Sequence, residues 1–405
     1  MEFTSEFFSG NRHKLLETTG AELIVLTANG LLQRSADDTF QFRQDSNFFY
    51  LTGINEKDFL LVISKENTFL IESKPSEYRS IMELNYDKKE LKVISGIDDI
   101  QDYHTGWTRL DVLLKKYKKA HTITPAESYI EHFGFYTNPA RATLLNELKK
   151  HRKLELIDIR KNLARQRQIK QPVELHTIQQ AIDITAKALK NVHKKLASYK
   201  YEYEAAADLT REFMRRGAMN HAFHPIVASG KHATVIHNFG NNGAIVKAEL
   251  LLFDVGAEMN NYSADISRTY SISTPTKRQQ AVYDAVLRVQ KQAMRLLKPG
   301  VHMREYEKQV DKIMAIELKK LGLITDTNDK KKLKKYYPHL TSHFLGLDTH
   351  DAADYDMPLE PGMVLTVEPG IYIPEESIGV RIEDDVLITK TGIKILSSGL
   401  PTTLN

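Results

Sequence analysis

The sequence predicts an α/β domain in its first 170 residues and an α+β domain in the remainder. With 405 residues, 41% of them hydrophobic, the chain is long enough to build two packed cores. Short apolar runs alternate with helical stretches up to about residue 170, whereas longer helices separate paired strands beyond it. We therefore place the domains at 1–170 and 171–405, with the boundary near Lys170.

The N-terminal part contains apolar runs of strand length. The runs at 22–26 and 59–63 read ELIVL and FLLVI, and the stretch at 144–153 has a helical pattern. Strands that alternate with helices are typical of an α/β domain.

Three long helices are predicted in the C-terminal part. The first opens at Pro172, a residue that the first turn of a helix tolerates, and carries an apolar stripe at spacings of three and four. The stripe consists of Leu175, Ile178, Ile182, Thr185, Leu189, Val192 and Leu196. The second helix begins after Thr276, with Gln279 completing a capping box, and ends before Pro299. The third helix covers 306–321.

Two strand pairs are predicted around these helices. The first pair, 250–255 and 262–272, is rich in β-branched and aromatic residues and is joined by the turn-forming Asn260-Asn261. The second pair is 363–373 and 380–389. Paired strands with packed helices indicate an α+β domain.

The composition indicates where the protein is located and which side chains can bind a metal. No run approaches the roughly 20 apolar residues that a membrane-spanning helix needs, and the acidic start MEFTSE lacks the features of a secretion signal. We therefore expect a cytoplasmic protein with no membrane partner. The sequence has no cysteine, so only His, Asp and Glu remain as strong metal ligands.

The charge balance does not suggest a nucleic-acid partner. Lys and Arg number 56 against 52 Asp and Glu, a small surplus for a chain of this length. The sharpest basic cluster, Lys330–Lys335, could in principle contact phosphates, but such a run is usually a solvated face.

Four acidic residues and one histidine occupy notable positions. Asp254 ends an otherwise apolar strand, and Asp265 lies within the returning strand. Glu368 and Glu383 repeat this arrangement in the second pair, and His343 lies in HLTSHFLGLDTHD. A carboxylate buried in an apolar strand needs a cation or a proton as its partner. Singly these residues are usually surface or packing residues, but together they predict a site.

These motifs resemble those of the pita-bread metallopeptidases, most closely aminopeptidase P, with prolidase and methionine aminopeptidase as more distant relatives. The matching features are the two aspartates eleven residues apart and the motifs SHFLGLDTHD, TVEPGIY and RIEDD. The segment RSADDTFQFRQDSNFFYLTG, residues 34–53, also resembles aminopeptidase P, so the resemblance covers nearly the whole chain. It implies an N-terminal α/β domain of the aminopeptidase P type followed by an α+β pita-bread catalytic domain.

The resemblance also implies a centre of two divalent metal ions per subunit. Asp254 would bind one ion, His343 and Glu368 the other, and Asp265 and Glu383 would bridge both. Such an oxygen-rich set suits Mn²⁺, or Co²⁺ or Mg²⁺, better than a structural zinc, and we expect Mn²⁺. Two such metals activate water as the nucleophile, so that no Ser or Cys nucleophile is needed.

Three further histidines match substrate-contacting positions of the family, namely His237, His339 and His350. We expect all three to bind substrate, and His237, His350 and Glu368 to act in catalysis, where hydrogen bonds stabilise the tetrahedral intermediate. For each histidine the alternative is a packing or capping role.

Arg381 and Asn47 complete the predicted substrate-binding residues. Arg381 lies two positions before Glu383, so both face the same side of a strand; it either pairs with a carboxylate of the pocket or neutralises the acidic residues 383–385. Asn47, two residues after Asp45, stands where the family commonly has an aspartate that meets the substrate's amine, often across a subunit boundary. Asparagine can accept a hydrogen bond but supplies no charge.

The predicted function is that of a metal-dependent aminopeptidase, a homodimer or homotetramer, that hydrolyses the N-terminal Xaa-Pro bond of peptides with proline in the second position. Within the same class the alternative is an Xaa-Pro dipeptidase, or prolidase. Methionine aminopeptidase is a less favoured alternative, because it has no N-terminal domain like residues 1–170. From another class, the alternatives are a non-catalytic pita-bread binding module and the metal-free creatinase, both of which typically lack the ligand set found here.

Overall fold

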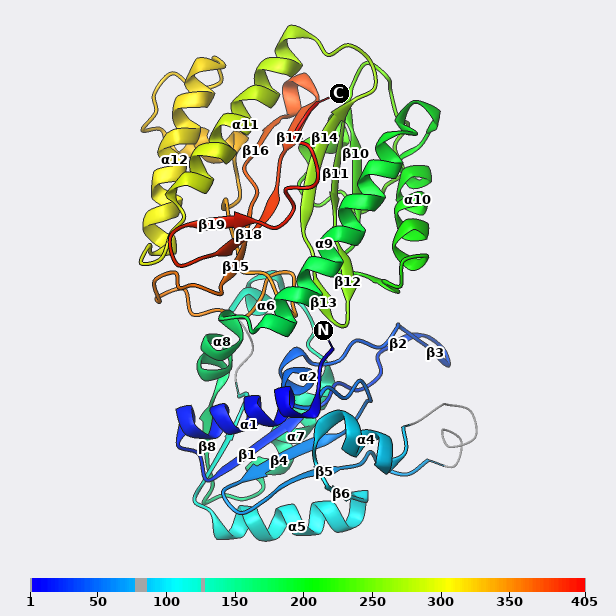
Figure 1. Ribbon diagram of the computed structural model, residues 1–405, viewed down its shortest axis with the longest axis vertical. Helices are drawn as coiled ribbons and strands as arrows, with labels where there is room; N and C mark the ends of the chain where they lie inside the picture. Colours follow the sequence, from blue (N-terminus) through cyan, green and yellow to red (C-terminus); the bar gives the residue numbers. More distant parts are fainter. Residues whose placement is uncertain (1, 77–85, 125–127, 405) are drawn as a thin grey trace. The chain divides into compact units, whose positions relative to one another are not determined.

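The protein forms two compact units, residues 2–166 and 167–404, whose division falls within helix α8 (Arg160–Gln168) (Figure 1). The computed structural model describes residues 2–76, 86–124 and 128–404. The predicted domain boundary near Lys170 lies a few residues beyond the division.

The N-terminal unit combines helices and strands in alternation. Its helices are α1 (Ser5–Thr19), α2 (Ser46–Thr52), α4 (Lys88–Ser95), α5 (Tyr103–Lys116), α6 (Ser128–Phe133) and α7 (Pro139–Lys149). Its strands are β1 (Leu23–Thr27), β2 (Gln33–Ser35), β3 (Asp38–Thr39), β4 (Leu60–Ser64), β5 (Thr68–Ile71), β6 (Asp99–Gln101), β7 (Lys119–Thr122) and β8 (Glu155–Asp158).

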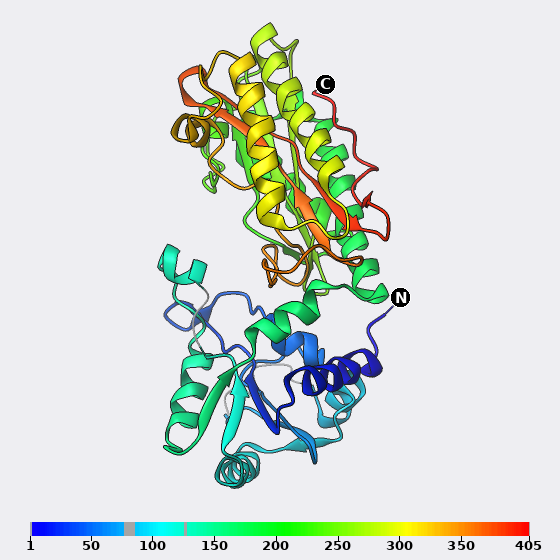
Figure 2. The same cartoon turned by 90° about the vertical axis from the view of Figure 1, so that its left-hand side faces the viewer.

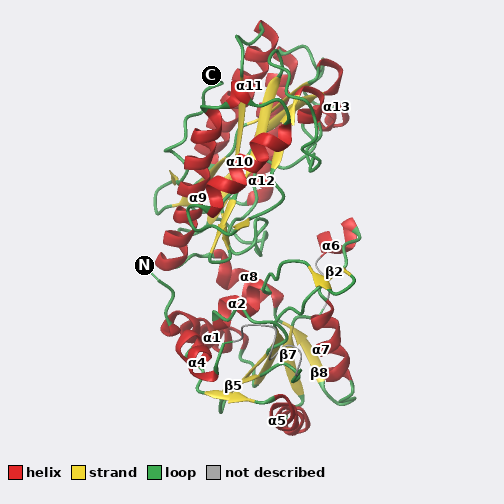
Figure 3. Cartoon of the chain, turned by 90° about the vertical axis from the view of Figure 1, so that its right-hand side faces the viewer, coloured by secondary structure: helices red, strands yellow, loops and turns green. Residues whose placement is uncertain are grey.

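A mixed sheet in the order β6-β5-β4-β1-β7-β8 forms the centre of this unit. β1 is antiparallel to β4 and parallel to β7. Apolar residues of one face of the sheet pack against α5 and α7, which lie beside the strands in Figure 3. The core residues include Leu23, Val25, Leu60, Val62, Leu110, Leu114, Leu144 and Leu148. The predicted α/β class is confirmed.

The helix predicted at 144–153 has different limits in the structure. It begins at Pro139, because the Asn138 side chain accepts a hydrogen bond from the Ala140 amide and Pro139 supplies a suitable first-turn residue. It ends at Lys149, before a turn that leads into β8.

The C-terminal unit contains two pairs of long helices and several short sheets. Its helices are α9 (Pro172–His193), α10 (Glu202–Met214), α11 (Lys277–Leu296), α12 (Met303–Lys320) and α13 (Lys330–Tyr336), with 3₁₀ turns η1 (Leu196–Ser198), η2 (Gly230–Thr234) and η3 (Pro374–Glu376). Its strands are β9 (Asn220–His221), β10 (Ile226–Ser229), β11 (Leu250–Val255), β12 (Ala257–Met259), β13 (Tyr262–Ser263), β14 (Ile266–Ser271), β15 (Val364–Val367), β16 (Gly370–Ile373), β17 (Ile378–Arg381), β18 (Asp384–Ile388) and β19 (Ile393–Ile395).

Within this unit the strands lie between the two helix pairs (Figure 1). Helices α9 and α10 pack against each other and contact β12 and β10, respectively. Helices α11 and α12 run side by side along the strands (Figure 2) and enclose a large apolar core with β15, β17 and β18. This arrangement confirms the α+β class.

The three long helices form where the sequence predicts them, but α9 ends at His193, so that Leu196 lies in η1, and α12 covers Met303–Lys320. α9 begins at Pro172, and the stripe residues Ile178, Ile182 and Leu189 are buried. α11 is capped by Thr276 and Gln279, which form the predicted capping box. Lys330–Lys335 lies on α13, where Lys330, Lys331 and Lys332 are exposed. Among the described residues, no helix has the length and apolar character needed to cross a membrane.

Each predicted strand pair is an antiparallel hairpin, but both are interrupted. In the first, β11 pairs with β14 and β12 pairs with β13, and Asn260 and Asn261 form the connecting turn with φ of 47° and 65°. In the second, β15 pairs with β18 and β16 with β17. The strand expected at 262–272 is therefore two strands, β13 and β14, and Asp265 lies in the break between them rather than inside one strand.

Gly256 permits the break in the first hairpin. It separates β11 from β12 and faces Ala264, so that an added Cβ atom would lie 1.8 Å from the Ala264 carbonyl oxygen. Only a glycine allows the two backbones to approach this closely. The packing at Gly256 therefore fixes the backbone next to Asp265.

Replacing Gly256 with alanine should force β12 away from Ala264. We expect Gly256→Ala to lower the free energy of unfolding by about 3 kcal/mol, the upper range for overpacked sites, as measured by urea denaturation. Gly399→Ala is the control, because a Cβ there meets no described atom within 4 Å. Equal unfolding midpoints for the two variants would contradict the close approach at Gly256.

Candidate metal centre and active site

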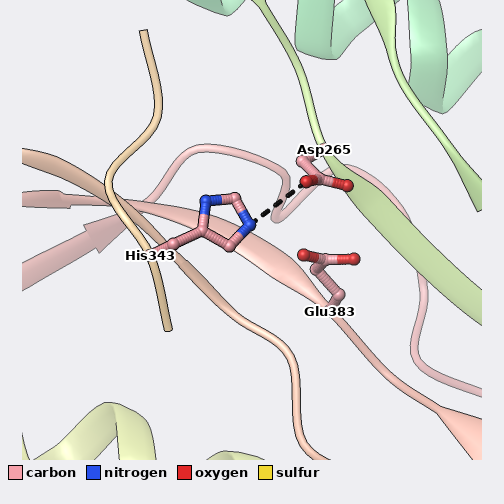
Figure 4. A group of neighbouring side chains, drawn as sticks. All are labelled: Asp265, His343 and Glu383. Atoms are coloured by element: carbon pink, nitrogen blue, oxygen red, sulfur yellow. Dashed lines mark ion pairs between the residues drawn. The ribbon is translucent and has the colours of Figure 1, made fainter. Parts of the chain in front are cut away.

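Asp265, His343 and Glu383 form a compact buried group in the C-terminal unit (Figure 4). One potential ligand atom from each lies within 4.8 Å of the other two. The His343 Nε2 atom is 3.4 Å from Asp265 Oδ2. All three residues are buried, with exposed fractions of 5%, 7% and 1%.

The interruptions of the two hairpins bring these residues together. Asp265 lies between β13 and β14, Glu368 between β15 and β16, and Glu383 between β17 and β18. The Glu383 amide donates a hydrogen bond to the Ser267 carbonyl, which joins the two hairpins directly beside the acids. Irregular strand positions of this kind often aim side chains into functional sites.

Glu368 and Asp254 extend the group. Glu368 Oε1 is 3.5 Å from His343 Nε2. Asp254, on β11, accepts a hydrogen bond of 2.6 Å from the Arg381 guanidinium through Oδ2. The five predicted metal ligands therefore lie near one another, with Asp265, His343 and Glu383 buried and Asp254 and Glu368 partly buried.

Burial raises the pKa of Asp265, Glu368 and Glu383, and neighbouring carboxylates raise each of them further. In the described part of the chain, Asp254 Oδ1 and Glu383 Oε1 are buried without a hydrogen-bond donor. Carboxylates crowded in this way need protons or cations between them.

His343 presents one ring nitrogen to these acids. Its Nδ1 atom lies 3.1 Å from the Phe344 carbonyl oxygen, which fixes the proton on Nδ1 and leaves the Nε2 lone pair facing Asp265 and Glu368. Burial, and then the nearby His350, lower the pKa of His343 to about 3, so the ring is neutral. A neutral imidazole is the form that binds metals. The Asp, His and Glu groups thus make a candidate metal-binding site.

The predicted substrate-contacting histidines surround this group. The His350 ring stacks on His343, with the ring centroids 4.0 Å apart and an interplanar angle of 20°. His339 Nε2 lies 2.8 Å from the Tyr372 hydroxyl. His237 is exposed, stacks on Phe239, and is close enough to both His339 and His350 to lower their pKa in addition to burial.

Arg381 pairs with a carboxylate of the pocket, the first of the two arrangements anticipated for it. Besides Asp254, its guanidinium donates to the Ser267 hydroxyl at 2.8 Å and to the Tyr372 hydroxyl at 2.7 Å. Because Tyr372 also contacts His339, Arg381 links the acidic group to the histidines.

Asn47 belongs to the N-terminal unit. It is the second residue of α2, where its amide and that of Phe48 donate to the Asp45 side chain. Asp45, the acid two residues earlier, is therefore occupied as the helix cap and also pairs with Arg141 at 3.2 Å. A contact of Asn47 with substrate stays a prediction.

Sequence reasoning missed several residues that hold the site in place. The Ser267 hydroxyl donates to Glu383 Oε2 at 2.7 Å, and the Thr366 hydroxyl accepts from the His343 amide at 3.2 Å. Glu307 of α12 accepts from the amides of Thr341 and Ser342, just before His343. Of these residues, only Ser267 could have been found from the sequence. It lies two residues after Asp265 in a strand-like segment, where both side chains would face the same side.

Comparisons with known proteins identify the family of the chain. The family model described as metallopeptidase family M24 matches residues 176–390, and the model of the aminopeptidase P N-terminal domain matches residues 8–123. The Xaa-Pro aminopeptidase of Escherichia coli is 31% identical, covering 98% of this chain and 96% of that protein, and that of Haemophilus influenzae is 32% identical, covering 91% and 88%. The structure of E. coli aminopeptidase P with the inhibitor Pro-Leu has a TM-score of 0.87 at 28% identity, covering 100% of this chain and 97% of that one.

These matches define a metallopeptidase with two domains. The chain belongs to the aminopeptidase P group of metallopeptidase family M24. The predicted fold class, an aminopeptidase P-type α/β domain followed by an α+β pita-bread domain, is confirmed.

The raised carboxyl pKa values predict that metal binding stabilises the protein more strongly at higher pH. In the chelated protein, the folded state binds protons more tightly than the unfolded chain, whose carboxyl pKa is roughly 4. This stabilisation is complete below about pH 4 and is lost as the pH rises through the folded-state pKa values. Metal ions replace these protons, so the gain in melting temperature on adding Mn²⁺ should be larger at about pH 8 than at about pH 5.

Thermal melts of the chelated and the Mn²⁺-supplemented protein over a pH series measure this gain. Asp265→Asn, which removes one acid of the group, serves as the comparison and should show a smaller gain at every pH. A gain that is absent or independent of pH would contradict metal binding by these carboxylates.

Proposed function

We propose that this protein is a dinuclear metal-dependent aminopeptidase that hydrolyses the N-terminal Xaa-Pro bond of peptides with proline in the second position. The observation that carries the proposal is the buried group of Asp265, His343 and Glu383, which the partly buried Glu368 and Asp254 extend. Its support is the match of residues 8–123 to the aminopeptidase P N-terminal domain and the similarity of nearly the whole chain to Xaa-Pro aminopeptidases.

The metal centre is proposed to hold two Mn²⁺ ions. Asp254 would hold one ion, His343 and Glu368 the other, and Asp265 and Glu383 both. One buried oxygen of Asp254 and one of Glu383 have no hydrogen-bond donor among the described residues, which supports this assignment. Carboxylate oxygens with a single imidazole suit Mn²⁺. Two such ions supply an activated water at neutral pH and polarise the scissile carbonyl.

The chain's own residues orient the substrate and handle protons. His350 and His237 offer ring N–H groups at the edge of the site, where they can stabilise the oxygen of the tetrahedral intermediate. Glu368, whose pKa burial raises, is suited to take the proton of the attacking water and pass it to the leaving amine. His339, held by Tyr372, completes the proposed substrate contacts.

The proposed partners are peptides, and the protein is proposed to act in the cytoplasm as a homodimer or homotetramer. Peptide substrates agree with the relatives, which are named Xaa-Pro aminopeptidases. Asn47 is proposed to accept a hydrogen bond from the substrate's amine through its side-chain oxygen. An ion pair with the amine is not possible, because the asparagine side chain carries no charge.

Two substitutions separate the proposed metal ligands from the proposed substrate contacts. The wild-type protein should bind about two Mn²⁺ ions per chain, since bridging acids serve a two-metal centre. Asp265→Ala should reduce this number and abolish hydrolysis, whereas His350→Ala should keep the ions and lower kcat by roughly 10²–10³-fold. Elemental analysis and steady-state kinetics measure both. Loss of the metals in His350→Ala would mean that the ligand set is wrongly assigned.

A peptide panel tests the substrate class. Contacts beyond the proline can stabilise the transition state, whereas a prolidase must hold the proline carboxylate with a positive charge that a longer peptide leaves unmatched. We therefore expect kcat/KM to fall in the order Ala-Pro-Ala, Ala-Pro, Ala-Ala-Ala, measured with Mn²⁺. A preference for Ala-Pro would identify a prolidase, and a preference for Ala-Ala-Ala would reject both. No hydrolysis by a metal-loaded protein would favour a non-catalytic binding module.

A further inference from the structure

A cluster of buried charges lies in the C-terminal unit outside the residues assigned to the metals or the substrate. We call it the Asp351 cluster, and it consists of the buried Arg167, Lys170, Glu174 and Asp351 together with the partly exposed Asp348. The side chains of Arg167, Lys170 and Asp351 are 2%, 1% and 1% exposed. Charged residues are rarely buried to this degree unless they are paired, so the cluster calls for a physical account.

Asp351 is held from two sides. The Lys170 ammonium donates to Asp351 Oδ2 at 2.9 Å, and the Arg167 guanidinium donates to Asp351 Oδ1. Arg167 also donates to Asp348 at 2.7 Å. Although burial alone would raise the pKa of Asp351, Arg167 and Lys170 lower it below its ordinary value, so the carboxylate is ionised.

The cluster fixes the segment 346–351, which carries His350. The Asp351 amide donates to the Phe344 carbonyl at 2.8 Å, and the Gly346 amide donates to the Asp348 carbonyl at 3.1 Å. A Cβ atom on Gly346 would lie 2.2 Å from Asp351 Oδ2, so the segment folds tightly around this carboxylate. Because Asp351 is the next residue after His350, its two cations restrain the backbone of His350.

Glu174, on α9, connects the cluster to β13, the strand that precedes Asp265. Glu174 accepts a hydrogen bond of 2.9 Å from the Tyr262 hydroxyl, and Ser263 donates through its amide to the Gly346 carbonyl at 2.8 Å. On the other side of His350, the Thr349 hydroxyl donates to the Ala222 carbonyl at 3.2 Å. His350 is therefore anchored through both of its neighbours.

Stability alone does not account for such a cluster. Buried ion pairs contribute little net stability compared with well-packed apolar residues of similar size. Ion pairs with short hydrogen bonds do, however, fix the relative orientation of the groups that they join. The group that gains a defined position here is His350, whose ring lies parallel to the candidate ligand His343.

We propose that Asp351, fixed by Arg167 and Lys170, is a positioning residue that holds His350 in the orientation needed for turnover. The inference rests on the proposed role of His350. Loss of the restraint leaves the metal ligands in place but lets the His350 ring move, and a misplacement of about 1 Å can cost on the order of 10²-fold in rate.

The test is a double-mutant cycle between Asp351 and His350, run on the full-length Mn²⁺-loaded protein. Asp351→Asn should lower kcat for Ala-Pro-Ala by roughly 10–100-fold, with KM and metal content little changed. In a His350→Ala background, Asp351→Asn should have no further effect on kcat, because the residue that it positions is gone. Lys170→Met, which removes one cation and keeps most of the side-chain volume, should show the same dependence on His350 and decides the test if Asp351→Asn does not fold.

Glu212→Gln is the matched control. Glu212 is also a buried carboxylate of the C-terminal unit, 2% exposed and paired with Arg216, but it lies on α10, and its hydrogen bonds to described residues join it to α9, to α10 and to Arg216 rather than to segment 346–351. It should lower the melting temperature while kcat stays at the wild-type value. An equal fall in kcat for Glu212→Gln would show that the Asp351 effect comes from general destabilisation, and it would overturn the inference.

Two other results would overturn the inference. Rate losses of Asp351→Asn and His350→Ala that multiply in the double variant would show that Asp351 acts independently of His350, and metal loss in Asp351→Asn would show that it acts on the metal ligands. Wild-type turnover in His350→Ala is a separate outcome, because it removes the role assigned to His350 under the proposed function and the inference with it.

Discussion

The mutual repulsion of buried carboxylates is the constraint on which the C-terminal unit depends. Asp265, Glu368 and Glu383 are raised in pKa by burial and by one another, and a buried oxygen of Glu383 has no hydrogen-bond donor in the described residues. Such a group is stable only with protons or cations between its members. A metal centre would meet this requirement, because divalent ions between the carboxylates would offset their mutual repulsion.

The interrupted hairpins are the structural answer to this constraint. In a continuous strand, successive side chains point to opposite faces of the sheet. The regular hydrogen-bond ladder would then fix the positions of the acids. The breaks at Asp265, Glu368 and Glu383 free their backbones to converge. Arg381 and Ser267 then connect the two hairpins through hydrogen bonds, and Arg381 brings one positive charge to an otherwise acidic group.

The histidines depend on a second layer of fixed charges. Tyr372 links Arg381 to His339, and the Asp351 cluster holds the segment of His350. The acids and the histidines are thus held partly by different networks, which are joined through Arg381 and Tyr372 and at the stacked rings of His343 and His350.

The sequence by itself determined the elements and the membership of the acidic group, because both depend on local patterns. Helical periodicity predicted α9, and the Thr276–Gln279 box predicted the start of α11; acids in apolar strands predicted Asp254 and Glu383 as site residues. Only the tertiary structure decided where the strands break, that Arg381 pairs with Asp254, and that Arg167 and Lys170 enclose Asp351. The physical reason is that these contacts join residues far apart in the chain, and a pattern of neighbouring residues carries no information about which distant charges will be buried together.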